Sequence, residues 1–173
     1  MFAVRCTRKL LMRGAPDVLE APVAPTTILG DWYANIVFTR PEHLVVCISE
    51  RTLLPVVVTA RNVKALPQRV ADAAEGMLRA IGIEPDAVAA EAREMQGGYL
   101  GVTKNRKVLG TLTDFMFHFE RSYQLRPGLS LQEHAVRLAE IPSAALGYAF
   151  PTEATRALFK AQQVTHAGRG SAV

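Results

Sequence analysis

The chain has 173 residues, of which 49% are hydrophobic and 21% are charged. This length and composition are sufficient for one domain with a buried core. No apolar run approaches the roughly 20 residues that a membrane-spanning helix needs, and the basic first segment lacks the apolar stretch of a secretory signal. We therefore expect a cytoplasmic protein with no membrane partner, while its oligomeric state stays open.

The formal net charge of +4 originates at the beginning of the chain. Residues 1–13 carry basic side chains and no acidic one, and the rest of the chain has equal numbers of both signs. A second short basic group follows at positions 104–107. The two groups either meet on one phosphate-binding surface or belong to an ordinary solvated surface. Their cations are Arg5, Arg8, Lys9, Arg13, Lys104, Arg106 and Lys107.

The first part of the chain has the pattern of strands. "FAVRCT" predicts a strand, followed by a short basic turn and a loop rich in Pro and Ala. From Asp31 onward, alternation places Trp32, Ile36 and Phe38 on the core side of a second strand and leaves its other side polar and aromatic. "LVVCIS" and "LLPVVVTA" predict two more strands. Their short connections indicate an antiparallel meander, in which Pro55 requires a sheet edge or a bulge.

After residue 61 the pattern becomes mostly helical. Pro67 and Pro85 suit the first turns of two helices, over 67–81 and 85–95, and Gly82 is a natural stop between them. "GGYLGVT" predicts a short strand. The longest apolar stripe with a helical period then runs from about residue 106 to 123. Two shorter helices are expected over 131–139 and 152–163.

These elements predict an α+β domain in which an antiparallel meander sheet of about four to five strands packs against a long central helix and three to four further helices. The domain should span residues 1–164, with residues 165–173 forming a disordered C-terminal tail. The apolar face of the second strand and the apolar stripe of the long helix must each be buried against another apolar surface. One core is therefore expected to contain Trp32, Ile36, Val46, Ile48, Val57, Leu112, Phe115 and Phe119.

The stretch "TKNRKVLGTLTDFMFHF" places several polar residues at the start of the long helix. Thr103 or Asn105 can cap its free backbone N–H groups. Capping does not explain the polar stripe along its flank, formed by Lys107, Thr111, Asp114, His118 and Arg121. One interpretation is a solvated helix face with an Asp114–His118 pair. The other is that the N-terminus of this helix forms one wall of an anion or polar-ligand site, with the stripe beside it.

Common catalytic and metal-binding patterns are absent. The chain has no Walker loop, G-x-S-x-G, H-E-x-x-H or C-x-x-C motif, and its histidines show no metal-ligand spacing, so we expect no metal. Cys6 and Cys47 lie in apolar strands and are expected to be buried and inert. Three carboxylates at element ends or on the long helix remain, Asp31, Glu50 and Asp114. If they converge, they could hold Mg²⁺ or act as acid and base; otherwise they serve turns and caps.

Several segments taken together resemble a known family. "VRCTRKLL", "LGDWYANI", "ISERTLLPVVV", "TKNRKVLGTLTDF" and "AEIPSAALGYAFP" occur in the order found in a bacterial family of small proteins described only as a domain of unknown function. The similarity extends from about Ala3 to Leu158. Lys107 and Thr113 depart from the small hydroxyl residue and the Asn that the family has there. The resemblance implies no activity.

The resemblance also implies which residues recur in the family. Most are polar, so they suggest either a buried hydrogen-bond network or a ligand site. The corresponding residues here are Arg5, Thr7, Lys9, Asp31, Trp32, Asn35, Glu50, Thr52, Thr103, Asn105, Arg106 and Asp114.

Two functions remain under consideration. The first is a non-catalytic binding or accessory protein that recognises nucleic acid or another anionic partner, without a cofactor. Its binding residues would include Arg5, Lys9, Asn35, Thr103, Asn105 and Arg106. The alternative is a small Mg²⁺-dependent hydrolase or nuclease for a phosphate-containing substrate, in which Asp31, Glu50 and Asp114 are the candidate catalytic residues.

Overall fold

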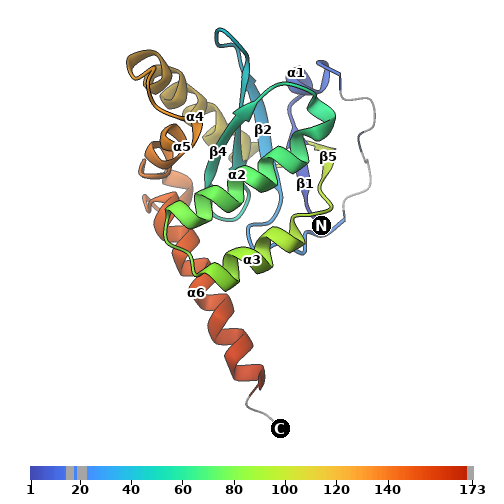
Figure 1. Ribbon diagram of the computed structural model, residues 1–173, viewed down its shortest axis with the longest axis vertical. Coiled ribbons are helices and arrows are strands. Elements are labelled where there is room, and N and C mark those ends of the chain that lie inside the picture. Colours follow the sequence, from blue (N-terminus) through green and yellow to red (C-terminus); the bar gives the residue numbers. More distant parts are fainter. Residues whose placement is uncertain (15–17, 19–22, 171–173) are drawn as a thin grey trace.

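The computed structural model of the protein describes residues 1–14, 18 and 23–170, with residues 166–170 described by their backbone alone (Figure 1). Part of the expected Pro/Ala-rich loop and the last residues of the expected tail, 171–173, therefore lie outside the described residues. Within the described part, an open five-stranded sheet and six α-helices form an α+β fold.

The sheet has the strand order β4-β3-β2-β1-β5. Its strands are β1 (Ala3–Cys6), β2 (Trp32–Val37), β3 (Leu44–Ser49), β4 (Pro55–Thr59) and β5 (Tyr99–Val102). The expected meander is confirmed for β2, β3 and β4, which pair antiparallel. The expectation of a purely antiparallel sheet is wrong, because β1 pairs parallel to both β2 and β5. Parallel neighbours require long connections, and β1 is separated from β2 by residues 7–31 and from β5 by residues 7–98.

The helices are close to the predicted segments. The structure has α1 (Arg8–Leu11), α2 (Leu66–Ala80), α3 (Pro85–Glu94), α4 (Arg106–Leu125), α5 (Leu131–Ala139) and α6 (Pro151–Gly170), with short 3-10 turns η1 (Val63–Ala65) and η2 (Ala144–Leu146). The expected long helix is α4, with 20 residues, and α6 has the same length. The backbone of residues 165–170 continues α6. The domain boundary at residue 164 and the disordered tail stay predictions.

Helices cover both faces of the sheet. The register places Tyr33 and Asn35 on the same face as Ile48 and Val46, and Trp32 on the opposite face. The α4 side covers the Tyr33 face, where the Asn105 N–H donates to the Tyr33 hydroxyl at 3.2 Å. Figure 1 shows α2 in front of the sheet and α4 behind it. The expected division of β2 into a core face and a polar face is therefore wrong, because both faces are covered.

The predicted core residues are all buried and belong to one cluster of apolar side chains. Because the sheet is covered on both sides, they divide between its two faces. The separate prediction that Phe38 lies on the core side of its strand is wrong. Phe38 is 52% exposed, since it follows the end of β2 at the hairpin. Cys6 and Cys47 are buried free thiols, as predicted, and burial raises the pKa of Cys6 to about 12.

The two edges of the sheet differ in what lies beside them. Strand β4 is an edge strand, as Pro55 predicted, and α5 packs along it. At the other end, Gly98 permits β5 to begin beside α2, because a Cβ there would lie 2.7 Å from the Phe2 ring and 2.8 Å from Pro67. No helix in the described part of the chain is both long and apolar enough to span a membrane.

Candidate functional site

Arg5, the first of the predicted binding residues, forms a buried ion pair with Asp31. The Arg5 Nη2 lies 2.5 Å from Asp31 Oδ2, and the Arg5 Nε–H donates to the same oxygen at 2.8 Å. The Ala3 N–H donates to Asp31 Oδ1 at 2.8 Å, and Arg5 Nη1 donates to the Val102 carbonyl at 3.3 Å. Both charged side chains are buried. This pair therefore joins β1, β5 and the start of β2, and its donors and acceptors are directed at the protein itself.

Other family-related polar residues also contact the protein. Asn35 Oδ1 accepts from the Thr7 hydroxyl at 2.7 Å. The Tyr33 hydroxyl donates to Glu50 Oε1 at 3.3 Å, and burial, followed by the nearby Glu50 charge, raises the Tyr33 pKa. Asn105 caps α4 by accepting from two backbone N–H groups of the first turn. These contacts give the side chains structural roles; their assignment as binding residues stays a prediction.

The other predicted residues are separate from this network. Arg106, Lys104 and Lys107 are exposed at the start of α4. The Lys9 ammonium lies 4.3 Å from the centre of the Phe38 ring, and Thr103 is half-buried. No ion pair involves Arg106 among the described residues. Arg106 is therefore not held against Asp31 or Glu50, as a structural lock at this residue would require.

The three candidate carboxylates do not converge on a metal site. Asp31 is buried with Arg5, Glu50 contacts Tyr33, and Asp114 is exposed in a different cavity beside His118. Within the described ranges, no group of three or more His, Cys, Asp and Glu side chains is placed to hold a metal ion. The arrangement that the hydrolase alternative requires is thus not formed by these residues.

A cationic pocket lies between the C-terminal half of α4 and α5. It has a volume of about 230 Å³. Among the described residues no carboxylate lines it, and none of its arginines forms an ion pair. We call it the arginine pocket, and its lining residues are His118, Arg121, Ser122, Leu125, Arg126, Arg137, Leu138 and Ile141.

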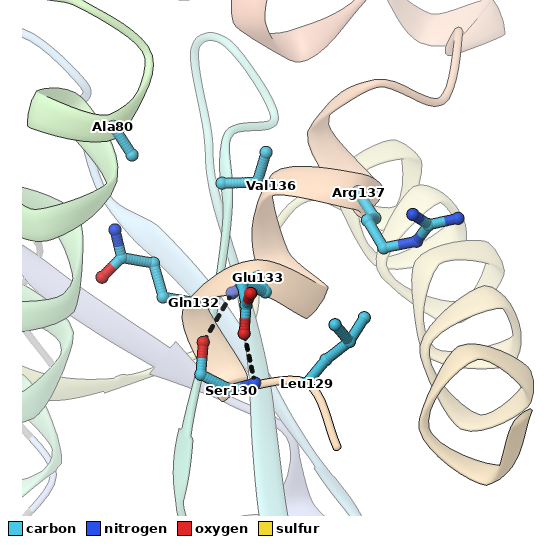
Figure 2. A pocket seen from close by; sticks show the side chains of 7 residues that line it. All are labelled: Ala80, Leu129, Ser130, Gln132, Glu133, Val136 and Arg137. Atoms are coloured by element: carbon cyan, nitrogen blue, oxygen red, sulfur yellow. Dashed lines mark hydrogen bonds between the residues drawn. The ribbon is translucent and has the colours of Figure 1, made fainter. Parts of the chain in front are cut away.

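Arg137 is the residue of α5 that contributes a positive charge to this pocket. Arg137 also lines a groove of about 530 Å³ between the end of α2 and α5, and Figure 2 shows its side chain extending from α5 toward α4. The neighbouring Glu133 does not neutralise it, because Glu133 turns back to accept from the Ser130 N–H at 2.7 Å in a capping box. The positive charge of Arg137 is therefore available to the pocket.

A buried histidine contacts one of the residues that line the arginine pocket. His134 is fully buried, and its Nδ1 lies 2.9 Å from the hydroxyl oxygen of Ser122, a lining residue. Its ring packs edge-on against Phe119. Burial lowers the pKa of His134, and the positive charge of Arg137 lowers it further. The hydrogen bond with His134 holds Ser122 in the pocket wall.

The lowered pKa of His134 predicts a loss of stability in acid. The unfolded chain binds a proton near pH 6.5, whereas the folded protein does so only at lower pH. The contribution of neutral His134 to the free energy of unfolding should therefore be complete above about pH 6.5 and decrease as the pH falls below that value. Urea unfolding at pH 7.5 and pH 5.5 should show a smaller loss for His134→Asn than for the unsubstituted protein. The exposed-site control His118→Asn should keep the full loss, and an equal loss in His134→Asn would contradict this role.

Sequence reasoning missed the arginine pocket, although it placed Arg121 on the polar stripe of α4. The sequence feature that could have indicated this pocket is the presence of Arg121, Arg126 and Arg137 in the C-terminal parts of two successive helices. Helix dipoles favour cations in the last turn and at the C-cap, so Arg126 and Arg137 each have a simple local explanation. Only the packing of α5 against α4 shows that the arginines line one pocket.

The comparisons with known proteins identify a family. No curated protein and no solved structure matches the chain. A family model described as "Domain of unknown function (DUF6933)" matches residues 3–154. This range includes the sheet, the buried polar network and both helices of the arginine pocket. The chain belongs to the DUF6933 family.

Proposed function

We propose that the protein is a non-catalytic binding protein that recognises a phosphate-bearing polyanion. The observation that supports this most directly is the arginine pocket, which Arg121, Arg126 and Arg137 line together with His118, with no carboxylate among its described lining residues. Guanidinium groups offer planar pairs of donors that match phosphate oxygens. All three arginines are exposed, and a surface with charges of one sign attracts ligands of the opposite sign. A phosphate group has that charge.

The dipoles of the two helices account for part of this arrangement. A cation near the C-terminal end of a helix is stabilising by about 0.3 to 1 kcal/mol, which accounts for Arg126 at the C-cap of α4 and Arg137 in the last turn of α5. It does not account for Arg121, which precedes the last turn of α4, and it does not require that the arginines of α4 and α5 share one pocket. The shared pocket is the feature that favours a ligand.

Fluorescence anisotropy tests the proposal. The probes are a labelled single-stranded oligonucleotide of mixed sequence and a labelled polyphosphate chain. Each phosphate contact on a single strand contributes about −0.7 to the slope of log K against log salt. The triple variant Arg121→Ala, Arg126→Ala and Arg137→Ala should therefore flatten the slope by about 2 units and weaken binding of both probes.

The matched control removes the same charge from the other end of α4. Lys104→Ala, Arg106→Ala and Lys107→Ala are substitutions of exposed residues, and we expect the slope to change much less than in the pocket variant. If the control flattens the slope and the pocket variant does not, the anion binds at the start of α4 instead. If the unsubstituted protein does not bind either probe in low salt at tens of micromolar, the proposed function is wrong.

A further inference from the structure

A second cavity adjoins the arginine pocket and has a different chemistry. It lies between α4 and the segment 141–148, has a volume of about 310 Å³ and shares His118 and Ile141 with the arginine pocket. We call it the aromatic cavity. Its lining residues are Thr111, Asp114, Phe115, Phe117, His118, Ile141, Pro142, Ser143, Ala144 and Tyr148.

Two exposed aromatic rings line this cavity from different elements. Phe117 on α4 is 64% exposed, and Tyr148, which follows η2, is 75% exposed. Tyr148 has a φ of 67°, an uncommon conformation for a residue with a side chain, and its N–H donates to the Ser143 carbonyl at 2.8 Å. The turn thus holds a large ring at the surface. Exposed aromatic rings beside a cationic groove are the components with which proteins bind single-stranded nucleic acid.

The charges give the two cavities different roles. Asp114 lines the aromatic cavity and is the one carboxylate among the described residues that line either cavity. A phosphate would be repelled there and attracted to the arginines of the neighbouring pocket. A nucleobase is uncharged, has two faces for stacking, and can offer an N–H group to a carboxylate. The charge pattern therefore directs a base to the aromatic cavity and the adjacent phosphate to the arginine pocket.

We propose that the two cavities form one binding surface for single-stranded nucleic acid, in which an unpaired base stacks on Phe117 or Tyr148 while Arg121, Arg126 and Arg137 hold the backbone phosphates. This inference rests on the proposed function and specifies its ligand. The faces of a base are available for stacking only where it is not paired within a duplex, so a single strand should bind more tightly than a duplex of the same sequence.

The experiment compares three labelled probes, namely a mixed-sequence single strand, its duplex and a polyphosphate chain, by fluorescence anisotropy in low salt. The variant is Phe117→Ala combined with Tyr148→Asn, because Asn tolerates a positive φ. Loss of one stacked base corresponds to a decrease in affinity of about 5-fold to 150-fold. We expect that decrease for the single strand and a change of less than about 2-fold for polyphosphate.

The control variant is Phe38→Ala, which removes an exposed aromatic ring outside both cavities and should leave the single-strand affinity unchanged. Unaltered thermal unfolding of each variant verifies that the fold is retained. Equal single-strand affinity in the unsubstituted protein and the Phe117/Tyr148 variant overturns the base site. If the arginine variant still weakens polyphosphate binding in that case, the proposed function remains and this inference alone is wrong. Preference for the duplex over the single strand would also overturn it.

Discussion

Replacing Asp31 with Ala should reduce the free energy of unfolding by about 3 to 5 kcal/mol, because it leaves the buried Arg5 guanidinium without its partner. The substitution also removes the acceptor of the Ala3 N–H. Arg5 and Asp31 are 7% and 2% exposed, so water cannot replace the lost contacts without opening the sheet. Urea unfolding followed by circular dichroism measures the loss.

Two further variants test the cause of this loss. Glu50→Ala removes a half-buried carboxylate that accepts one hydrogen bond from Tyr33, and should cost about 0.5 to 1.5 kcal/mol. The double variant Arg5→Met with Asp31→Leu removes both charges together and should be more stable than Asp31→Ala. If Asp31→Ala costs less than about 1 kcal/mol, the ion pair does not hold the strands together, and Arg5 becomes available for the binding role that the sequence suggested.

Phe115→Ala should cost about 3 to 5 kcal/mol by leaving a cavity beneath α4. Phe115 is buried in the apolar cluster on the Tyr33 side of the sheet, and α4 contacts both β2 and β3 there. Chemical unfolding at neutral pH provides the measurement. Phe117→Ala is the matched control, since it removes the same side chain from the exposed side of the same helix and should change stability by less than about 0.5 kcal/mol. Equal losses in the two variants would show that the helix does not pack by its predicted stripe.

The sequence predicted those elements whose signals are local. The apolar residues of β2 and β3, the prolines in the first turns of α2 and α3, and the apolar stripe of α4 are all local signals, and these elements agree with the structure. The strand directions were only partly predicted. The parallel pairing of β1 with β5 depends on the path of the chain between residues 6 and 99, which no local pattern specifies.

The site was harder to predict for the same reason. The prediction placed the polar residues that resemble the family pattern at strand and helix ends. Asp31 and Asn105 do lie at the starts of β2 and α4, whereas Asn35 lies inside β2 and Asp114 inside α4. Their partners could not be assigned from the sequence. Arg5 was assigned to a basic surface because it lies in a basic segment, whereas its position in β1 directs it to Asp31. The arginine pocket and the aromatic cavity require α5 and the segment 141–148 to lie beside α4. These contacts follow from tertiary packing, which periodicity does not encode.

The position of β1 between β2 and β5 also determines the order in which the sheet can form. The hairpins of β2, β3 and β4 need only nearby residues, but the outer neighbour of β1 begins at Tyr99. Until that residue has been synthesised, one side of β1 has unpaired backbone groups, and Arg5 lacks the Val102 carbonyl. Contacts between such distant residues slow folding. The meander is therefore a unit that can assemble early, and the N-terminal strand is completed by a segment made nearly a hundred residues later.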